Sequence, residues 1–165
     1  MIQFIDMDEI EENLWLGNLA AAENITELKN KGIKKILTVM SGLGPKYSAE
    51  DGFIHKKYDV IDFSGQNIIK YFCECLNFIK GEEKVLVHCM AGASRSATIV
   101  IAYLMWTKKM KYDDAHKIVK NKRFIIWPNP GFIEQSKMFD KLLVENDYDI
   151  EKKIKFDEIK IDLFN

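Results

Sequence analysis

Apolar residues recur along this chain at two different spacings, which predict where strands and helices lie. Short runs rich in β-branched residues favour buried strands, whereas apolar residues three or four positions apart favour helices. The predicted strands cover residues 9–17, as a short strand or hairpin, and residues 35–40, 53–60 and 84–88. The predicted helices cover residues 24–31, 67–80, 96–109, 113–122 and 130–145.

Local signals mark the ends of these elements and the loops between them. Asn24 can cap a helix with Glu27 three residues later, and Gly32 suits the position just past the end of that helix. Residues 41–52 hold three glycines and a proline, so we expect a loop long enough to be functional. Residues 61–66 form a turn-like segment before the next helix.

The order of these elements predicts the fold class. Strands that alternate with helices indicate an α/β domain with a central, mostly parallel β-sheet flanked by helices. The chain has 165 residues, which fits one domain. We expect this domain to cover residues 1–146. The tail, residues 147–165, alternates apolar and charged residues and is either an edge strand or loosely attached.

Charge and hydropathy exclude two classes of partner. The chain carries 24 basic and 25 acidic residues, for a formal net charge of −1. Nucleic acids and anionic membrane surfaces attract basic proteins, so we expect neither as a partner. The longest apolar run, residues 97–106, is about half of the ~20 residues that a membrane span needs, and it reads as a buried core helix. Only two basic residues are arginines, Arg95 and Arg123, so each needs an explanation.

The cysteines and the N-terminus indicate an intracellular protein, in the cytoplasm, the nucleus or both. Three cysteines, Cys73, Cys75 and Cys89, do not make a disulfide framework. The first ten residues carry acidic side chains where a signal peptide would carry basic ones. Residues two apart on a helix point about 200° apart, so Cys73 and Cys75 cannot share a metal ion. No other pattern indicates a metal or a cofactor, and we expect neither.

The segment 88–96, between a predicted strand and a predicted helix, carries the strongest chemical signal. His88, Cys89, Gly92, Arg95 and Ser96 match the pattern H-C-x-x-G-x-x-R-S, which random sequence of this composition would give roughly once in a million chains. A strand–loop–helix turn directs backbone N–H groups at an anion. Gly92 lets the backbone bend, and the planar fork of Arg95 can hold two phosphate oxygens.

Cys89 is the candidate nucleophile in this segment. A helix N-terminus and a nearby cation both stabilise a thiolate over a thiol. A thiolate beneath a bound phosphate is a nucleophile aimed at phosphorus. The alternative is a buried structural thiol, which Arg95 and Gly92 in register disfavour.

These residues resemble the signature H-C-x5-R-[ST] of the cysteine-dependent protein tyrosine phosphatase superfamily. The form H-C-x-A-G-x-S-R-S is similar to that of the dual-specificity protein phosphatase family. The likeness covers about residues 9–145. It continues in Leu16-Gly17 with Ala20–Ala22 and Asn24, in Asp62 five residues before Asn67, and in Pro128-Asn129-Pro130-Gly131-Phe132 with Gln135.

The resemblance implies a two-step phosphate hydrolysis. Cys89 attacks phosphorus, and Asp62 first gives a proton to the leaving oxygen and then acts as base for water. Ser96 would donate a hydrogen bond to the sulfur. Arg95 and the loop amides would carry the transition-state charge. The phosphate-binding residues are then Met90, Ala91, Gly92, Ala93, Ser94 and Arg95.

Two supporting roles follow from the same resemblance. His88 would orient the loop and tune the thiolate by hydrogen bonding, although a core histidine is an open alternative. Asn129 would brace the loop from outside. Asp59 and Asp51 compete with Asp62 as the acid, because loop aspartates often cap turns.

Two further segments have simpler interpretations. The apolar run 124–127 is either core or a pocket wall, and core is the default expectation. The lysine-rich stretches 108–111 and 120–123, the latter ending at Arg123, are expected to be solvated helix faces.

The leading function is therefore an intracellular phosphatase acting on phosphotyrosine and phosphoserine or phosphothreonine in proteins. One alternative is a phosphoinositide or RNA phosphatase, which would hold extra phosphates with charges that this loop lacks. Another is an inactive phosphoprotein-binding module, although Cys89, Arg95 and Asp62 are all present. A sulfur-transfer or arsenate-reducing enzyme is disfavoured by the separate acid loop. The partners expected are phosphoproteins, and the sequence gives no oligomeric state.

Overall fold

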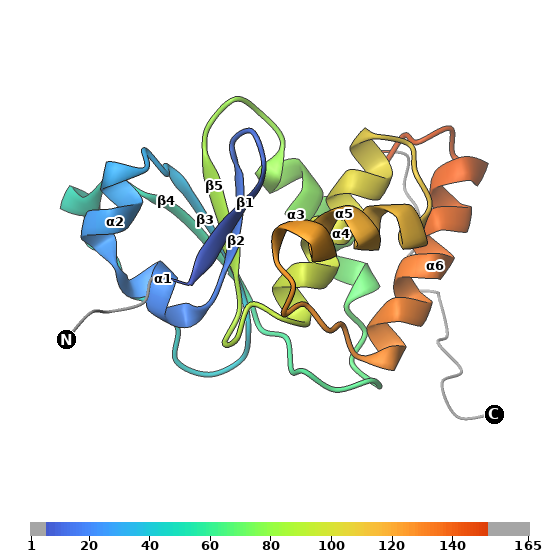
Figure 1. Ribbon diagram of the computed structural model, residues 1–165, viewed down its shortest axis with the longest axis horizontal. Coiled ribbons are helices and arrows are strands. Elements are labelled where there is room, and N and C mark those ends of the chain that lie inside the picture. The colour runs from blue at the N-terminus through green and yellow to red at the C-terminus, as the bar shows by residue number, and fades with distance from the viewer. Residues whose placement is uncertain (1–5, 152–165) are drawn as a thin grey trace.

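A five-stranded sheet forms the centre of the molecule in the computed structural model, which describes residues 6–151. The strands are β1 (Met7–Glu11), β2 (Leu14–Gly17), β3 (Lys35–Val39), β4 (Ile54–Tyr58) and β5 (Val85–His88). Their order across the sheet is β1-β2-β5-β3-β4 (Figure 1). β1 and β2 form an antiparallel hairpin, and the other neighbours pair in parallel, which confirms the predicted mostly parallel sheet.

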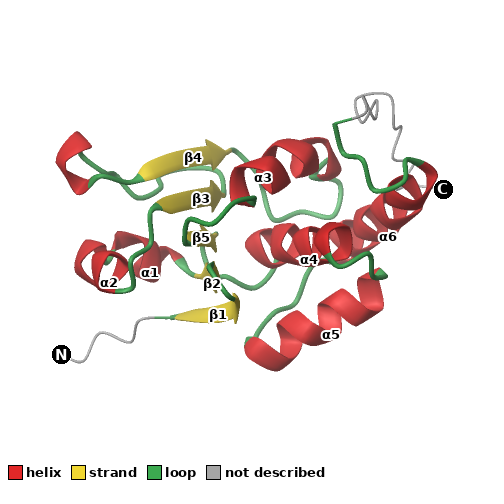
Figure 2. Cartoon of the chain, turned by 90° about the horizontal axis from the view of Figure 1, so that it is seen from above, coloured by secondary structure: helices red, strands yellow, loops and turns green. Residues whose placement is uncertain are grey.

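Helices cover both faces of this sheet. Figure 2 shows α1 and α2 on one face and α3, α4, α5 and α6 on the other. On the first face, α1 covers Leu19–Glu23 and α2 covers Ile25–Asn30. On the second face lie α3 (Phe72–Ile79), α4 (Arg95–Thr107), α5 (Tyr112–Lys122) and α6 (Pro130–Glu145). Two short 3₁₀ helices, η1 (Ala49–Asp51) and η2 (Ile69–Tyr71), lie in the connections.

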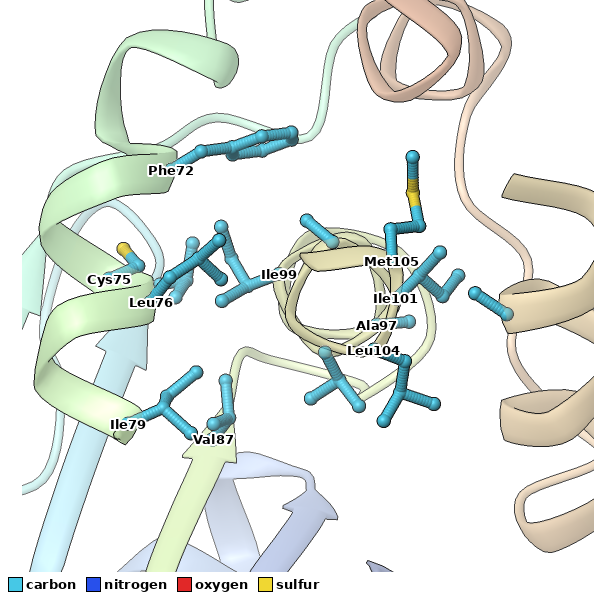
Figure 3. Close-up of a cluster of buried hydrophobic side chains, with 14 of the residues drawn as sticks. Phe72, Cys75, Leu76, Ile79, Val87, Ala97, Ile99, Ile101, Leu104 and Met105 are labelled. Carbon is cyan, nitrogen blue, oxygen red and sulfur yellow. The ribbon is translucent and has the colours of Figure 1, made fainter. Parts of the chain in front are cut away.

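Helix α4 is the centre of the larger core. Nine of its 13 residues are buried, as its apolar sequence predicts. Figure 3 shows Phe72, Leu76 and Ile79 of α3 pointing toward α4, with Val87 of β5 beside them. Because α4 is held on several sides, its first residue is fixed relative to the end of β5. The start of α4 is therefore a rigid place for a binding loop.

The structure differs from the predicted elements at two places. Helix α1 was not predicted; it is a short alanine-rich turn that the side chain of Asn18 caps through the N–H of Ala21. The helix predicted from residue 67 begins only at Phe72. The reason is that Gln135 Oε1 accepts hydrogen bonds from the N–H groups of Ile68 and Ile69, which keeps these two residues out of α3.

The tail packs against the core as far as the structure describes it. Ile150 is buried, and the indole of Trp106 donates a hydrogen bond of 2.9 Å to the carbonyl of Tyr148. Residues 152–165, which hold most of the predicted tail, lie outside the described residues. Within residues 6–151, no helix is long and apolar enough to cross a membrane.

Candidate active site

The candidate site forms where the parallel strands end. β5 ends at His88, and the phosphate loop, residues 89–94, leads directly into α4 at Arg95. Gly92 in this loop has a positive φ of 65°. A Cβ atom at Gly92 would come within 2.5 Å of the carbonyl oxygen of Gly17 and 2.8 Å of a guanidinium nitrogen of Arg123. Only glycine fits both the conformation and the space.

Cys89 lies at the base of this loop and is only 2% exposed. The hydroxyl of Ser96 donates a hydrogen bond of 3.1 Å to its sulfur. The sulfur also lies in the loop that leads into the N-terminus of a 13-residue helix, where partial positive charge favours an anion. Ser96 and the start of α4 therefore both place partial positive charge near this sulfur.

Arg95 joins the phosphate loop to the acid loop, residues 59–67. Its Nη1 donates to the carbonyl of Val60 at 3.1 Å. Its Nε is buried and has no hydrogen-bond partner among residues 6–151, which the structure describes. Buried donors are almost always paired, so this nitrogen is available for an oxygen of a substrate phosphate.

Asp62 is the aspartate that reaches the phosphate loop. Its Oδ1 accepts the hydroxyl of Ser94 at 2.7 Å and the amide of Asn129 at 2.9 Å. The N–H of Asn129 donates in turn to the hydroxyl of Ser94 at 3.1 Å. Asp62, Ser94 and Asn129 therefore form a closed set of contacts between three separate loops.

The two competing aspartates have other partners. Asp59 pairs with Lys57 at 2.9 Å. Asp51 caps η1, where hydrogen bonds from Ser48 lower the pKa of its carboxyl. Within residues 6–151, neither carboxylate has a hydrogen bond or an ion pair with the phosphate loop, so the geometry favours Asp62.

His88 is fully buried, and burial lowers its pKa to about 4. Its Nδ1 lies 3.2 Å from the carbonyl oxygen of Cys89, and its Nε2 lies 2.7 Å from the hydroxyl of Thr38. A carbonyl only accepts, so Nδ1 carries the proton and Nε2 accepts from Thr38. His88 thus holds the backbone of Cys89 rather than its sulfur.

The hydroxyl of Thr38 has a second imidazole partner. The Nε2 of His55 lies 2.8 Å away. A hydroxyl has one proton, which Thr38 gives to His88, so the Nε2–H of His55 donates to Thr38. This chain of hydrogen bonds fixes the tautomer of His88, and no sequence pattern pointed to it.

Arg123 corrects one sequence-based expectation. It was expected on a solvated helix face, yet it is only 2% exposed. Its Nε donates to the carbonyl of Gly92 at 2.8 Å and its Nη2 to that of Ala91 at 3.2 Å. Its Nη1 forms ion pairs of 2.7 Å with Asp6 and with Asp8. Arg123 therefore supports the phosphate loop from behind, and its rarity among lysines was the available signal.

The apolar run 124–127 corrects a second sequence-based expectation. Ile126 is buried, as expected of core. Phe124 is 80% exposed and Trp127 is 76% exposed, so the core expectation is wrong for both. The backbone of Trp127 donates a 2.7 Å hydrogen bond to the carbonyl of Ala93, which keeps the run beside the phosphate loop.

No ligand set for a metal emerges from the described part of the chain. Between residues 6 and 151, no three His, Cys, Asp or Glu side chains come together to hold an ion. Cys73 and Cys75 lie on α3 as free thiols, and burial raises the pKa of Cys73 to about 11.

Comparison with known proteins gives a family match over most of the chain. The model of the dual specificity phosphatase catalytic domain matches residues 14–141. Dual specificity protein phosphatase 1B of Arabidopsis thaliana is 41% identical over 145 residues, which cover 86% of each chain. Human dual specificity protein phosphatase 9 is 35% identical over 139 residues, which cover 82% of this chain and 36% of that protein.

Solved structures show the same fold. The crystal structure of DUSP15 has a TM-score of 0.81 and 30% identity, with 90% of this chain and 97% of that chain covered. The crystal structure of human tyrosine phosphatase-like serine/threonine/tyrosine-interacting protein has a TM-score of 0.80 and 36% identity, with 85% and 99% covered. This chain therefore belongs to the dual specificity phosphatase family, and it is a dual specificity protein phosphatase.

Proposed function

We propose that this phosphatase removes phosphate from tyrosine and from serine or threonine in proteins through a cysteinyl-phosphate formed on Cys89. The observation that supports this most is the hydrogen bond from Ser96 to the Cys89 sulfur, in the loop that also leads to the unpartnered Nε of Arg95. A nucleophile and an oxyanion donor are thereby held in one rigid turn.

In the first step, the thiolate of Cys89 attacks phosphorus and forms an S–P bond. The bond from phosphorus to the substrate oxygen breaks, and that oxygen receives a proton from Asp62. Both hydrogen bonds that Asp62 accepts go to Oδ1, so Oδ2 is the oxygen that would carry this proton.

In the second step, Asp62 accepts a proton from water while the water oxygen attacks phosphorus. The S–P bond breaks, and inorganic phosphate and the Cys89 thiolate are the products. Ser96 stabilises the departing sulfur through its hydrogen bond.

Other residues position these groups. Arg95 and the loop amides hold the phosphate oxygens in both steps. His88 fixes the Cys89 carbonyl, and Asn129 holds Asp62 against Ser94. The phosphate loop contributes the backbone of Met90, Ala91, Gly92, Ala93 and Ser94. All these residues lie within residues 1–146, the segment that we propose as the catalytic domain.

The charge of the loop favours a single phosphate. Its side chains from Met90 to Ser94 are uncharged, so Arg95 is the cation that the loop itself supplies. A phosphoinositide or a triphosphorylated RNA would bring further phosphates without matching cations in this loop, which is costly close to a buried site.

A side-by-side assay tests the substrate class. Phosphopeptides, phosphoinositides and triphosphorylated RNA are compared by kcat/KM at one ionic strength. We expect phosphopeptides to exceed the others by at least about tenfold, or ~1.4 kcal/mol in transition-state binding. Equal or faster turnover of the lipid or the RNA would contradict the proposal.

A further inference from the structure

A pocket of about 310 Å³ lies beside the active site, between α5, α6 and the loop that joins them. Its lining is mostly apolar and consists of His116, Lys120, Trp127, Pro128, Pro130 and Ile133. None of these residues has a role in the proposed hydrolysis. The pocket therefore needs an explanation of its own.

The wall of this pocket and the active site share one short backbone segment, residues 127–130. The backbone N–H of Trp127 donates a hydrogen bond to the carbonyl of Ala93 in the phosphate loop. Asn129, which lies between two lining prolines, contacts both Ser94 and Asp62. Because Cα atoms of consecutive residues are ~3.8 Å apart, we expect a residue two or three positions from the phosphorylated one to lie over this shared segment.

Large exposed apolar side chains occur on the segments that form the active site and one wall of the pocket. Large apolar side chains are exposed on the acid loop, the phosphate loop and the 124–127 run. They are Ile61, Phe63, Met90, Phe124, Ile125 and Trp127. These side chains are therefore accessible to a peptide bound at the active site.

The two polar lining residues do not make the pocket an anion site. The ammonium of Lys120 donates to the carbonyl of Ile126 at 2.7 Å and lies 5.5 Å from the centre of the Trp127 ring. Lys120 thereby holds the loop and the indole in place. Burial, and secondarily Lys120, lower the pKa of His116, which disfavours a positive charge on its ring. The pocket thus presents rings and prolines to a ligand.

We propose that this pocket binds a large apolar side chain of the phosphoprotein substrate, two or three residues from the phosphorylated residue. The proposal rests on the proposed phosphatase function and adds a determinant of sequence preference to it. Trp127 supplies a flat apolar wall, and Ile133, Pro128 and Pro130 supply the rest of the apolar lining. Transfer of a large apolar side chain from water into such a pocket favours binding by about tenfold or more.

The test measures how fast the full chain hydrolyses a set of phosphotyrosine peptides. Phenylalanine is placed in turn at each of the three positions on either side of phosphotyrosine, in an otherwise alanine- and serine-based sequence. The measured quantity is the ratio of kcat/KM for the phenylalanine peptide to that for the alanine peptide. We expect this ratio to reach about ten at one position two or three residues away.

Variants locate the preference. Trp127→Ala removes an exposed ring and should reduce the ratio to near one. Ile133→Trp fills the pocket instead of emptying it and should do the same. Phe124→Ala is the matched control, because Phe124 is equally exposed in the same run but does not line the pocket, and it should keep the ratio.

The experiment distinguishes a failure of the pocket proposal from a failure of the proposed phosphatase function. A ratio near one at every position in the wild-type enzyme would overturn the pocket proposal, as would a ratio that survives both Trp127→Ala and Ile133→Trp. A chain that hydrolyses neither these peptides nor p-nitrophenyl phosphate would instead contradict the phosphatase function itself.

Discussion

The hydroxyl of Ser94 donates a hydrogen bond of 2.7 Å to Oδ1 of Asp62, and this contact joins the acid loop to the phosphate loop. Ser94 is in the phosphate loop and Asp62 follows β4, so the two are 32 residues apart in the chain. The contact sets where the proposed acid lies relative to the phosphate that we propose Arg95 to hold. It also leaves Oδ2 as the oxygen that would deliver a proton.

Replacement of Asp62 by Asn should lower kcat by about 10²–10⁴, the usual contribution of a general acid. Asn keeps an oxygen that can accept from Ser94, so the loops should stay joined. The loss should shrink for a substrate with an activated leaving group, which needs no proton. Steady-state kinetics with phenyl phosphate and p-nitrophenyl phosphate measure this difference.

Asp59→Asn is the control for the acid, because Asp59 pairs with Lys57. Asp59→Asn should lower kcat far less than Asp62→Asn does. A larger loss from Asp59→Asn than from Asp62→Asn would mean that the acid is Asp59.

The oxyanion site should depend on the planar fork of Arg95 and not on a metal. Arg95→Lys removes Nε and the bidentate geometry, so the inhibition constant of orthovanadate should rise at least about tenfold. EDTA should leave the activity of the wild-type enzyme unchanged, since Arg95 and the loop amides supply the positive charge. Loss of activity in EDTA that a divalent ion restores would contradict this.

Arg123 should be a large contributor to the free energy of unfolding. Arg123→Leu would leave the carbonyls of Ala91 and Gly92 and the paired carboxylates of Asp6 and Asp8 without their donor. We expect a loss of about 3 kcal/mol, at the low end for a broken buried ion pair because both aspartates are partly exposed. Urea denaturation measures it, and the exposed neighbour Lys122→Leu is the control.

An effect of Arg123→Leu no larger than that of Lys122→Leu would show that the buried guanidinium contributes nothing to stability. Such a result would also contradict the role of Arg123 in supporting the phosphate loop.

His88 should make the stability depend on pH below neutrality. Its pKa is about 4 in the folded protein against an ordinary value of 6.5. Between these two values the unfolded chain binds a proton that the folded protein does not, so stability is full above pH 6.5 and is lost as the pH falls toward 4. The change from pH 7 to pH 5 should cost about 2 kcal/mol.

Urea denaturation at the two pH values measures this loss. His88→Gln should remove most of the difference, whereas His116→Gln, at a less buried position, should remove less. The same pH dependence in His88→Gln as in the wild-type protein would assign the effect to other groups.

Sequence patterns predicted the sheet and the strand–loop–helix turn of residues 88–96 because both depend on local information. The strand ending at His88, the glycine at residue 92 and the apolar helix after it are all contiguous. The predicted cap of α2 by Asn24 is confirmed. It too depends on local information, because its partner Glu27 is three residues away.

The remaining features depend on contacts between distant segments. Arg123 binds Asp6 across 117 residues, and Gln135 accepts from Ile68 across 67. Trp127 is apolar but exposed, because its backbone is held at Ala93 while its side chain faces the pocket. Composition and spacing describe neither the packing partner nor the direction of a side chain, so these features could not be predicted.

The most direct test of the account is the turnover number of Cys89→Ser. A serine hydroxyl is a far weaker nucleophile than a thiolate near pH 7, whereas Arg95 and the loop amides remain to bind phosphate. We predict that turnover of a phosphotyrosine peptide is abolished while the peptide still binds with an affinity close to that of the wild-type enzyme. A Cys89→Ser variant with a kcat within tenfold of the wild-type value would contradict Cys89 as the nucleophile.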